Sequence, residues 1–417
     1  MTIAVYAVLL ASLAICFISL RRPGCMLALL WAMFASEQLL QSKIQIFASL
    51  GILANVIPVI GCCLAVALQV MRGGPFLWTE RIQIRVIALM LLAGTSALWS
   101  VAPDITIKIF KENLPYFVAF CIVGPLCINS YKDLQDGIWA STLLSIPLLI
   151  GLATADTQSR GIALLDGTVG TPLAVASLAA YSAISAFTLS ITVKRRWVQI
   201  ALISISLLAF FVILKTGSRG QLVGCVLAVA FAAYIVRNVA LKLSLVATAA
   251  IVIIVVLASL YAIDEIGGKF LGFESRWDRQ SLIDDMQGIR LHMVQGLWNS
   301  YINGGPFVWV FGLGSSASYK LVGFYCHVVP IEVICELGLL GFSLYCSIFY
   351  YAIKDGLTSL VRAKDRSSEK VALSILLSII VLEALLQLKQ GALLGTHSVM
   401  LCCIIIGRVA VVSKRLQ

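Results

Sequence analysis

The sequence of 417 residues is poor in charge, because only 12% of its residues are Asp, Glu, Lys or Arg. A soluble domain has about 25% of such residues and needs them to cover its surface. Most of the remaining composition is apolar, with 60% hydrophobic residues and a mean hydropathy of +0.99. These values exclude an ordinary soluble protein and indicate that lipid is the main solvent of the chain.

Several motifs of known enzyme and metal sites are missing. The chain has no P-loop, no GxGxxG that opens a helix, no HExxH and no Asp-rich loop. No CxxC pair occurs, and most of the twelve cysteines lie inside apolar runs, where cysteine behaves as a small hydrophobic residue. We therefore expect no metal, no cofactor and no disulfide framework. The chain also has no internal repeat.

Basic residues outnumber acidic ones by 31 to 20, which gives a net charge of +11. They form no stripe interleaved with aromatic residues, so we expect no nucleic acid partner. An excess of Lys and Arg in alternate loops is typical of the cytoplasmic side of a membrane protein. One set of alternate loops, which we assign to the cytoplasm together with the C-terminus, holds Arg21, Arg22, Arg72, Arg81, Arg85, Lys132, Lys194, Arg195, Arg196, Arg237, Lys242, Lys354, Arg362, Lys364, Arg366, Lys370, Arg408, Lys414 and Arg415.

Apolar runs long enough to cross a bilayer, about 20 residues each, recur along the chain. They predict an all-α polytopic protein with about 12–13 transmembrane helices, forming a single integral-membrane domain over residues 1–417. The first run is expected to be retained as a span, because no basic stretch precedes it and no cleavage site follows it. The candidate runs are 3–20, 24–40, 45–71, 83–100, 109–129, 137–154, 169–193, 197–214, 221–236, 241–262, 329–353, 370–387 and 391–410.

One large loop, residues 263–328, lies on the opposite, exterior side. Its stretch Arg276–Asn303 has apolar residues at helical spacing, which predicts an amphipathic helix at the membrane interface or over a cavity. Glycines at 304–305 and at 312 and 314 predict two turns after this helix.

The segment 215–220, Lys-Thr-Gly-Ser-Arg-Gly, joins two apolar runs on the exterior side, where basic loops are disfavoured. Glycines let the backbone approach a ligand closely, and the guanidinium of Arg219 can bind a phosphate, with Lys215 and Ser218 beside it. The alternative is a tight hairpin whose arginine reaches lipid headgroups.

Arg290 lies on the predicted amphipathic helix, eight residues before Trp298. It is a candidate second clamp on a phosphate, and the alternative is a solvated residue on the polar face of the helix.

His327 stands where the large loop re-enters the membrane. An imidazole there can accept a proton from a hydroxyl near neutral pH, whereas the simpler interpretation is a histidine that is hydrogen-bonded at a helix start.

Glu332 and Glu336 follow in the first two turns of the next run, four residues apart and therefore on one helix face. Carboxyl groups inside a membrane are costly and often functional, so they could serve as acid and base. The alternatives are pairing with nearby basic residues and the favourable place of a carboxylate near a helix N-terminus.

Arginines and a histidine without a metal suit a substrate that carries its own activated leaving group, such as a lipid diphosphate-linked sugar. The arginines would stabilise charge on the departing diphosphate, and a general base would activate an acceptor hydroxyl.

A set of short motifs follows in order along roughly residues 90–345: Trp-Ser-Val-Ala-Pro-Asp at 99–104, Gly-Ser-Arg-Gly at 217–220, Arg290 with Trp298, Phe-Gly-Leu-Gly at 311–314, His327, Ile-Glu-Val at 331–333 and Glu-Leu-Gly-Leu-Leu-Gly at 336–341. This order resembles the O-antigen ligase and polymerase family of bacterial surface-polysaccharide enzymes. Val328 stands where that family often has asparagine after the histidine.

The resemblance implies a metal-independent glycosyltransferase of the bacterial inner membrane, with residues 263–328 as a periplasmic loop and an active site that faces the periplasm. The donor would be an undecaprenyl diphosphate-linked glycan. A ligase transfers it to lipid A–core oligosaccharide, and a polymerase adds it to a growing chain. By position, Arg219 and Arg290 would hold the diphosphate, and His327 would act as the base or orient the acceptor.

Two alternatives stay open. The loop near 155–168 is short and holds only Arg160, whereas a polymerase of O-antigen or exopolysaccharide often has two sizeable Arg-rich loops, so a ligase is favoured. A transporter, the alternative of another class, should have repeated halves with broken helices, and the sequence has no such repeats.

Overall fold

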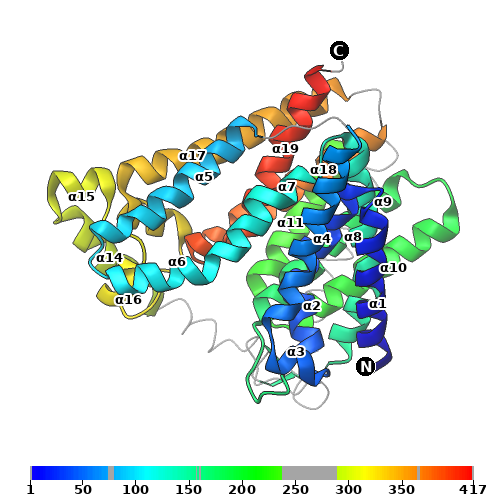
Figure 1. The fold of residues 1–417 in the computed structure, drawn as a ribbon, viewed down its shortest axis with the longest axis horizontal. Helices are drawn as coiled ribbons and strands as arrows, with labels where there is room; N and C mark the ends of the chain where they lie inside the picture. Colours follow the sequence, from blue (N-terminus) through cyan, green and yellow to red (C-terminus); the bar gives the residue numbers. More distant parts are fainter. Residues whose placement is uncertain are drawn as a thin grey trace. The chain divides into compact units, whose positions relative to one another are not determined.

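The computed structural model describes residues 2–73, 79–155, 157–158, 161–236, 289–363 and 367–415, and nearly all of them are helical (Figure 1). A two-stranded antiparallel hairpin, β1 with β2, is the one sheet in these ranges. The elements are α1 (Thr2–Ser19), η1 (Pro23–Cys25), α2 (Met26–Gln41), α3 (Gln45–Ser49), α4 (Ile52–Met71), α5 (Arg81–Thr95), η2 (Ser96–Leu98), α6 (Pro103–Phe117), the π-helical η3 (Val118–Val123), α7 (Gly124–Leu126), α8 (Tyr131–Ala153), β1 (Thr157–Gln158), β2 (Gly161–Ile162), α9 (Pro172–Thr192), α10 (Arg196–Lys215), α11 (Arg219–Val236), α14 (Ile289–Ile302), α15 (Gly305–Phe311), α16 (Ala317–Leu321), α17 (Val329–Arg362), α18 (Ser367–Gln387), η4 (Leu393–Gly395) and α19 (His397–Arg415).

Nine helices in the described ranges are long and apolar enough to cross a membrane, which makes the chain a multi-pass membrane protein. The predicted all-α class is confirmed. Twelve of the thirteen apolar runs coincide with helices, and the run 241–262 lies outside the described residues.

Several predicted boundaries were wrong, since α8 begins six residues earlier and α17 ends nine residues later than predicted, and three others have a local reason. The run 45–71 is two helices, because the backbone leaves the helical region at Leu50. The run 109–129 begins earlier, at Pro103, whose fixed φ suits the first helical position. The run 391–410 begins only at His397, after Gly391 with φ 96° and the 3-10 turn η4.

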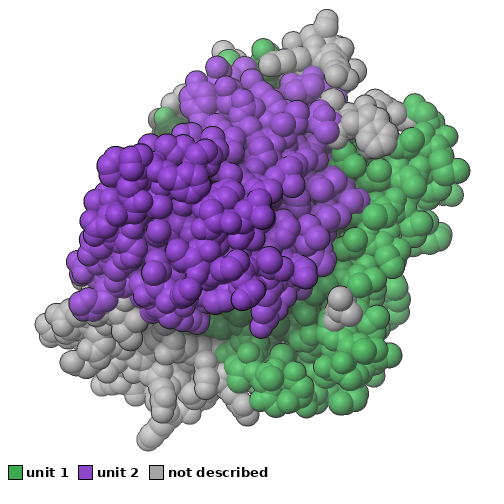
Figure 2. Space-filling view, turned by 60° about the vertical axis from the view of Figure 1, so that its left-hand side comes forward, with its two compact units in different colours: residues 1–76, 126–279, 360–382 green, residues 77–125, 280–359, 383–417 purple. Residues whose placement is uncertain are grey.

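The chain forms two compact units, coloured separately in Figure 2, and each unit is assembled from several segments. Unit 1 holds residues 1–76, 126–279 and 360–382, and unit 2 holds residues 77–125, 280–359 and 383–417.

Helices α2 and α9 form the core of unit 1. In each of them 78% of the membrane-length window is buried, against 28% for α10. Small residues allow this close packing, since Ala176, Ala179, Ala180 and Ala183 of α9 are fully buried at helical spacing. A Cβ on Gly137 of α8 would come within 2.9 Å of the Leu27 side chain. Close backbone approach, which small residues permit, therefore holds this bundle together.

Basic residues gather at one end of unit 1, which we call the basic end. Helices α1, α4 and α9 finish there, and α2, α8, α10 and α18 start there. The segments at this end are linked by a hydrogen bond from the guanidinium of Arg72 to the carbonyl of Leu20 (2.5 Å) and by an ion pair of Arg22 with Asp136 (3.6 Å). Its described basic residues include Arg21, Arg22, Arg72, Lys132, Lys194, Arg195, Arg196 and Lys370, whereas the opposite end has Lys43, Lys215 and Arg219.

Unit 2 contains α5, α6, α17, α19 and the three helices of the large loop. Helix α5 lies beside the second half of α17, where Arg81 pairs with Asp355 and Arg85 lies 4.2 Å from the ring centre of Tyr351 (Figure 1). Glu80 caps α5 by accepting hydrogen bonds from the backbone N–H groups of residues 82 and 83.

The predicted amphipathic helix Arg276–Asn303 is described from residue 289 onward, as α14, and residues 276–288 lie outside the described part. The predicted turns are confirmed, because Gly305, Gly312 and Gly314 all have positive φ. Buried residues from α14, the turn at 312–314, α16, the segment before α17 and α17 itself form a small apolar core in this unit: Leu297, Tyr301, Leu313, Ala317, Cys326 and Cys335.

Candidate functional site

Helix α17 is broken near its start, at Gly338, where φ is 65° and ψ is −168°. A helix break leaves the carbonyls of the preceding turn without helical partners. The turn at 312–314 supplies replacements: the N–H of Leu313 donates to the carbonyl of Cys335 (2.9 Å), and that of Gly314 to the carbonyl of Glu336 (2.9 Å). The motifs at 311–314 and 336–341 are therefore parts of one substructure.

The motif at 99–104 joins the same substructure from its other side. The indole N–H of Trp99 donates to the carbonyl of Phe311 (3.3 Å), and the N–H of Val101 donates to that of Leu313 (3.2 Å). The hydroxyl of Ser100 donates to the carbonyl of Ser315 (3.1 Å). Three motifs that are distant in sequence thus meet within unit 2.

Glu336 and Glu332 are buried, and both bind backbone amides. Glu336 accepts hydrogen bonds from the N–H groups of Ser316 (2.6 Å) and Ser318 (2.9 Å) at the start of α16. Glu332 accepts one from the N–H of Leu393 (3.0 Å) in η4, and its second oxygen is buried without a hydrogen-bond partner among the described residues. Within the described part of the chain, neither carboxyl group forms an ion pair with a basic side chain. Both residues therefore fix the frame around His327.

Replacing Glu336 by alanine should strongly destabilise unit 2, because it leaves two buried N–H groups without acceptors. At about 1–3 kcal/mol for each unsatisfied group, such a loss costs about 2–6 kcal/mol in total. Glu336→Gln keeps one acceptor oxygen and should cost less. Chemical unfolding of the purified protein in detergent measures the difference, with Glu112→Ala, an exposed position on α6, as the matched control. Equal stability of Glu336→Ala and Glu112→Ala would contradict this role.

His327 lies in the turn before α17 and has a φ of 63°. A non-glycine residue with positive φ is uncommon, and such strain gathers at functional sites. Among the described residues only one other non-glycine residue, Ser316, has it. The half-buried imidazole lies 4.1 Å from the ring centre of Tyr325 and 5.4 Å from that of Phe324. His327 is therefore held in an aromatic cluster just before the start of α17.

The neighbouring polar groups are less suited than an imidazole to accept a proton near neutral pH. Burial, followed by the nearby Glu332 and Tyr325, raises the pKa of Tyr319 to about 12. Burial raises the pKa of the Cys326 thiol to about 11. Both groups keep their protons at neutral pH, whereas an ordinary histidine titrates there.

Arg290 and Trp298 lie on α14, about 12 Å apart along its axis at 1.5 Å per residue. Trp298 is 37% exposed, and its ring lies 5.7 Å from that of Tyr301. The hydroxyl of Tyr301 donates to the carbonyl of Trp309 on α15 (2.9 Å), which fixes α14 within the loop substructure.

The segment 215–220 forms the predicted hairpin between α10 and α11 in unit 1, with Gly217 at φ 63°. Buried Ser218 and half-buried Arg219 stand at the start of α11. The ammonium of Lys215 donates to the carbonyls of Ala153 and Ala155 (both 2.8 Å) and approaches that of Leu152 (3.5 Å). An ammonium has three donors, so in this arrangement Lys215 caps the end of α8.

Unit 2 thus brings together His327, Glu332, Glu336 and the helix of Arg290 and Trp298, whereas Lys215, Ser218 and Arg219 belong to unit 1. Sequence reasoning missed the aromatic cluster of Tyr319, Phe324 and Tyr325, although the run of aromatic residues before His327 was a visible signal. It also missed the break at Gly338.

Within the described residues, no three His, Cys, Asp or Glu side chains are grouped so that they could hold a metal ion. No family model matches the chain, and no sequence among curated proteins matches it either.

Proposed function

We propose that this protein is a metal-independent glycosyltransferase that moves glycan from undecaprenyl diphosphate to lipid A–core oligosaccharide at the periplasmic face of a bacterial inner membrane. The observation that carries the proposal is the meeting, in unit 2, of the motifs at 99–104, 311–314 and 336–341 beside His327. These are the motifs on which the resemblance to O-antigen ligases rests, and their order alone did not require them to be in contact.

In this reaction an acceptor hydroxyl attacks the anomeric carbon of the donor sugar. A bond forms between the acceptor oxygen and that carbon, and the bond from the carbon to the diphosphate oxygen breaks. His327 takes the hydroxyl proton, and undecaprenyl diphosphate leaves as an anion. Arg290, in the same unit as His327, would stabilise the charge on the leaving diphosphate, since guanidinium groups bind phosphate oxygens in pairs. The role of Arg219 in binding the diphosphate is what the resemblance implies.

The other candidate residues have supporting roles in this proposal. Glu332 holds η4 against α17, Glu336 holds α16 against it, and together they keep the turn of His327 in place. Lys215 is left out of diphosphate binding, because its donors are used at the end of α8. Phe324, which is 44% exposed, adds an apolar ring face beside the imidazole, against which a substrate can pack.

Complementation of two null strains of a cognate host, one without its O-antigen ligase and one without its polymerase, tests the proposal. We expect the wild-type chain to restore a lipopolysaccharide ladder on gels in the ligase-null strain. Arg219→Ala should abolish the ladder while the protein level in the membrane holds, because removing a clamp on the leaving group acts on the transition state. Exposed Lys111→Ala on α6 is the matched control and should keep the ladder.

Each other result has a defined meaning. Rescue of the polymerase-null strain alone would replace the ligase proposal by a chain-extending enzyme with the same donor. Rescue of neither strain would overturn the glycosyltransferase proposal and favour a transporter.

A further inference from the structure

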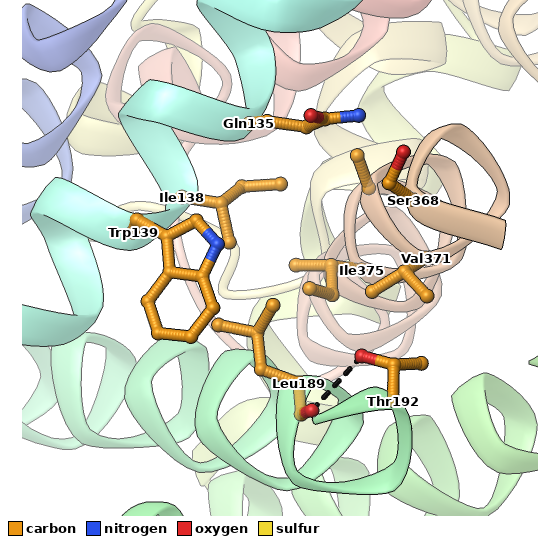
Figure 3. Close-up of a pocket in the computed structure, with 9 residues that line it drawn as sticks. Gln135, Ile138, Trp139, Leu189, Thr192, Ser368, Val371 and Ile375 are labelled. Carbon is orange, nitrogen blue, oxygen red and sulfur yellow. Dashed lines mark hydrogen bonds between the residues drawn. The ribbon is translucent and has the colours of Figure 1, made fainter. Parts of the chain in front are cut away.

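Unit 1 has a cavity of about 210 Å³ between α8, α9 and the start of α18 (Figure 3). Its inner wall is apolar and buried, with Ile138, Leu189 and Ile375 pointing into it. The volume is several times the roughly 30 Å³ that one water occupies in the liquid, and an apolar cavity of this size takes hydrocarbon in preference to water. The cavity therefore fits several methylene groups of an alkyl chain.

The rim of the cavity is polar and reaches the surface. Thr192 and Ser368 are exposed, and Trp139 is 36% exposed, with its indole at the edge of the cavity. Gln135 lies at the rim on the same helix as Trp139. A tryptophan between an apolar wall and polar groups is typical of the membrane–water interface. The cavity thus combines an apolar interior with a hydrogen-bonding mouth.

The mouth lies at the basic end of unit 1. Three rim residues are each close in sequence to basic side chains: Gln135 follows Lys132 by one turn, Thr192 precedes the run Lys194, Arg195 and Arg196, and Ser368 precedes Lys370 by two residues. The side chains of Lys132, Lys194, Arg195 and Arg196 are exposed.

Three acidic residues of the described part stand nearby. Asp136 pairs with Arg22 (3.6 Å), and Asp133 accepts hydrogen bonds from the hydroxyl of Ser130 (2.8 Å) and the N–H of Asn129 (3.1 Å). Glu369 is the third. Among the described residues near the mouth, the five basic side chains Lys132, Lys194, Arg195, Arg196 and Lys370 outnumber the three acidic ones, which leaves a net positive charge there.

We propose that this cavity binds an anionic glycerophospholipid of the adjacent leaflet. One acyl chain enters the apolar interior, and the phosphate group is held by the basic run 194–196 and by Lys132. Basic pockets between transmembrane helices are a known type of site for anionic lipid headgroups. The basic side chains attract the phosphate of the lipid, while the apolar wall packs against its acyl chain. The proposal is independent of the glycosyltransferase proposal, whose histidine lies in unit 2.

Native mass spectrometry of the full-length chain tests the proposal, with phosphatidylglycerol and phosphatidylcholine of identical acyl chains as probes. We expect phosphatidylglycerol to bind and phosphatidylcholine to bind about tenfold or more weakly. The triple variant Lys194→Gln, Arg195→Gln and Arg196→Gln should weaken phosphatidylglycerol binding about tenfold or more. Ser368→Trp, which fills the mouth, should weaken binding of both lipids.

A charge-matched control separates the site from net charge. The triple variant Lys43→Gln, Lys108→Gln and Lys111→Gln also removes three positive charges, at exposed positions that do not line the cavity. It should bind phosphatidylglycerol as the wild type does. Equal weakening by both triple variants would show attraction to the whole surface and overturn the proposal, as would equal binding of the two lipids by the wild type.

Discussion

Replacing His327 by asparagine should lower the rate of glycan transfer by about a hundredfold to ten-thousandfold, the range that a general base contributes. Asparagine suits this test because it tolerates a positive φ better than most residues, and φ at this position is 63°. The turn before α17 should therefore keep its shape while the proton acceptor is lost. The rate is measured with the purified protein, a lipid diphosphate-linked glycan and lipid A–core acceptor, and product is scored on gels.

His292→Asn is the matched control, because His292 is an exposed histidine on α14 in the same large loop. It should transfer glycan at the wild-type rate. Thermal unfolding of both variants should match that of the wild type, which separates a chemical role from a structural one. Transfer by His327→Asn within a few fold of the wild type would remove the histidine from the mechanism and leave it a residue of the turn.

The helices of this protein could be predicted from composition alone, since long apolar runs can satisfy their backbone in lipid only as helices. Their irregular points could not. The break at Gly338 depends on N–H donors from residues 313 and 314, which lie more than twenty residues away in sequence. No sequence pattern near Gly338 indicates hydrogen-bond partners that are so distant along the chain.

In the candidate site, too, the residues could be predicted from the sequence but their contacts could not. His327 and the two glutamates could be selected because charged or titratable groups are rare in apolar sequence. Their roles depend on what each one contacts: Glu336 binds the amides of α16, and Lys215 binds the carbonyls of α8. The sequence shows that a polar group is present, whereas its hydrogen-bond partner can be read only from the fold.

Replacing Gly314 by alanine should be among the most damaging single changes in unit 2. Its φ is 90°, a conformation that costs an L-residue about 1–2 kcal/mol. A Cβ there would also overlap the backbone of Ser100, and forcing extra atoms into packed structure costs about 1–3 kcal/mol more. We expect a loss of about 2–5 kcal/mol in the free energy of unfolding, measured by denaturant titration, together with loss of transfer.

Gly323→Ala is the control that separates these two costs. Gly323 has a similar φ of 81°, in the segment that leads to His327, but a Cβ there would meet no atom within 4 Å. The free energy of unfolding of this variant should therefore fall only by the cost of the backbone conformation, about 1–2 kcal/mol. If both variants are destabilised equally, residues 99–104 do not lie against the turn at 312–314. The contact between these motifs would then be lost as an argument for the glycosyltransferase proposal, whatever the result at His327.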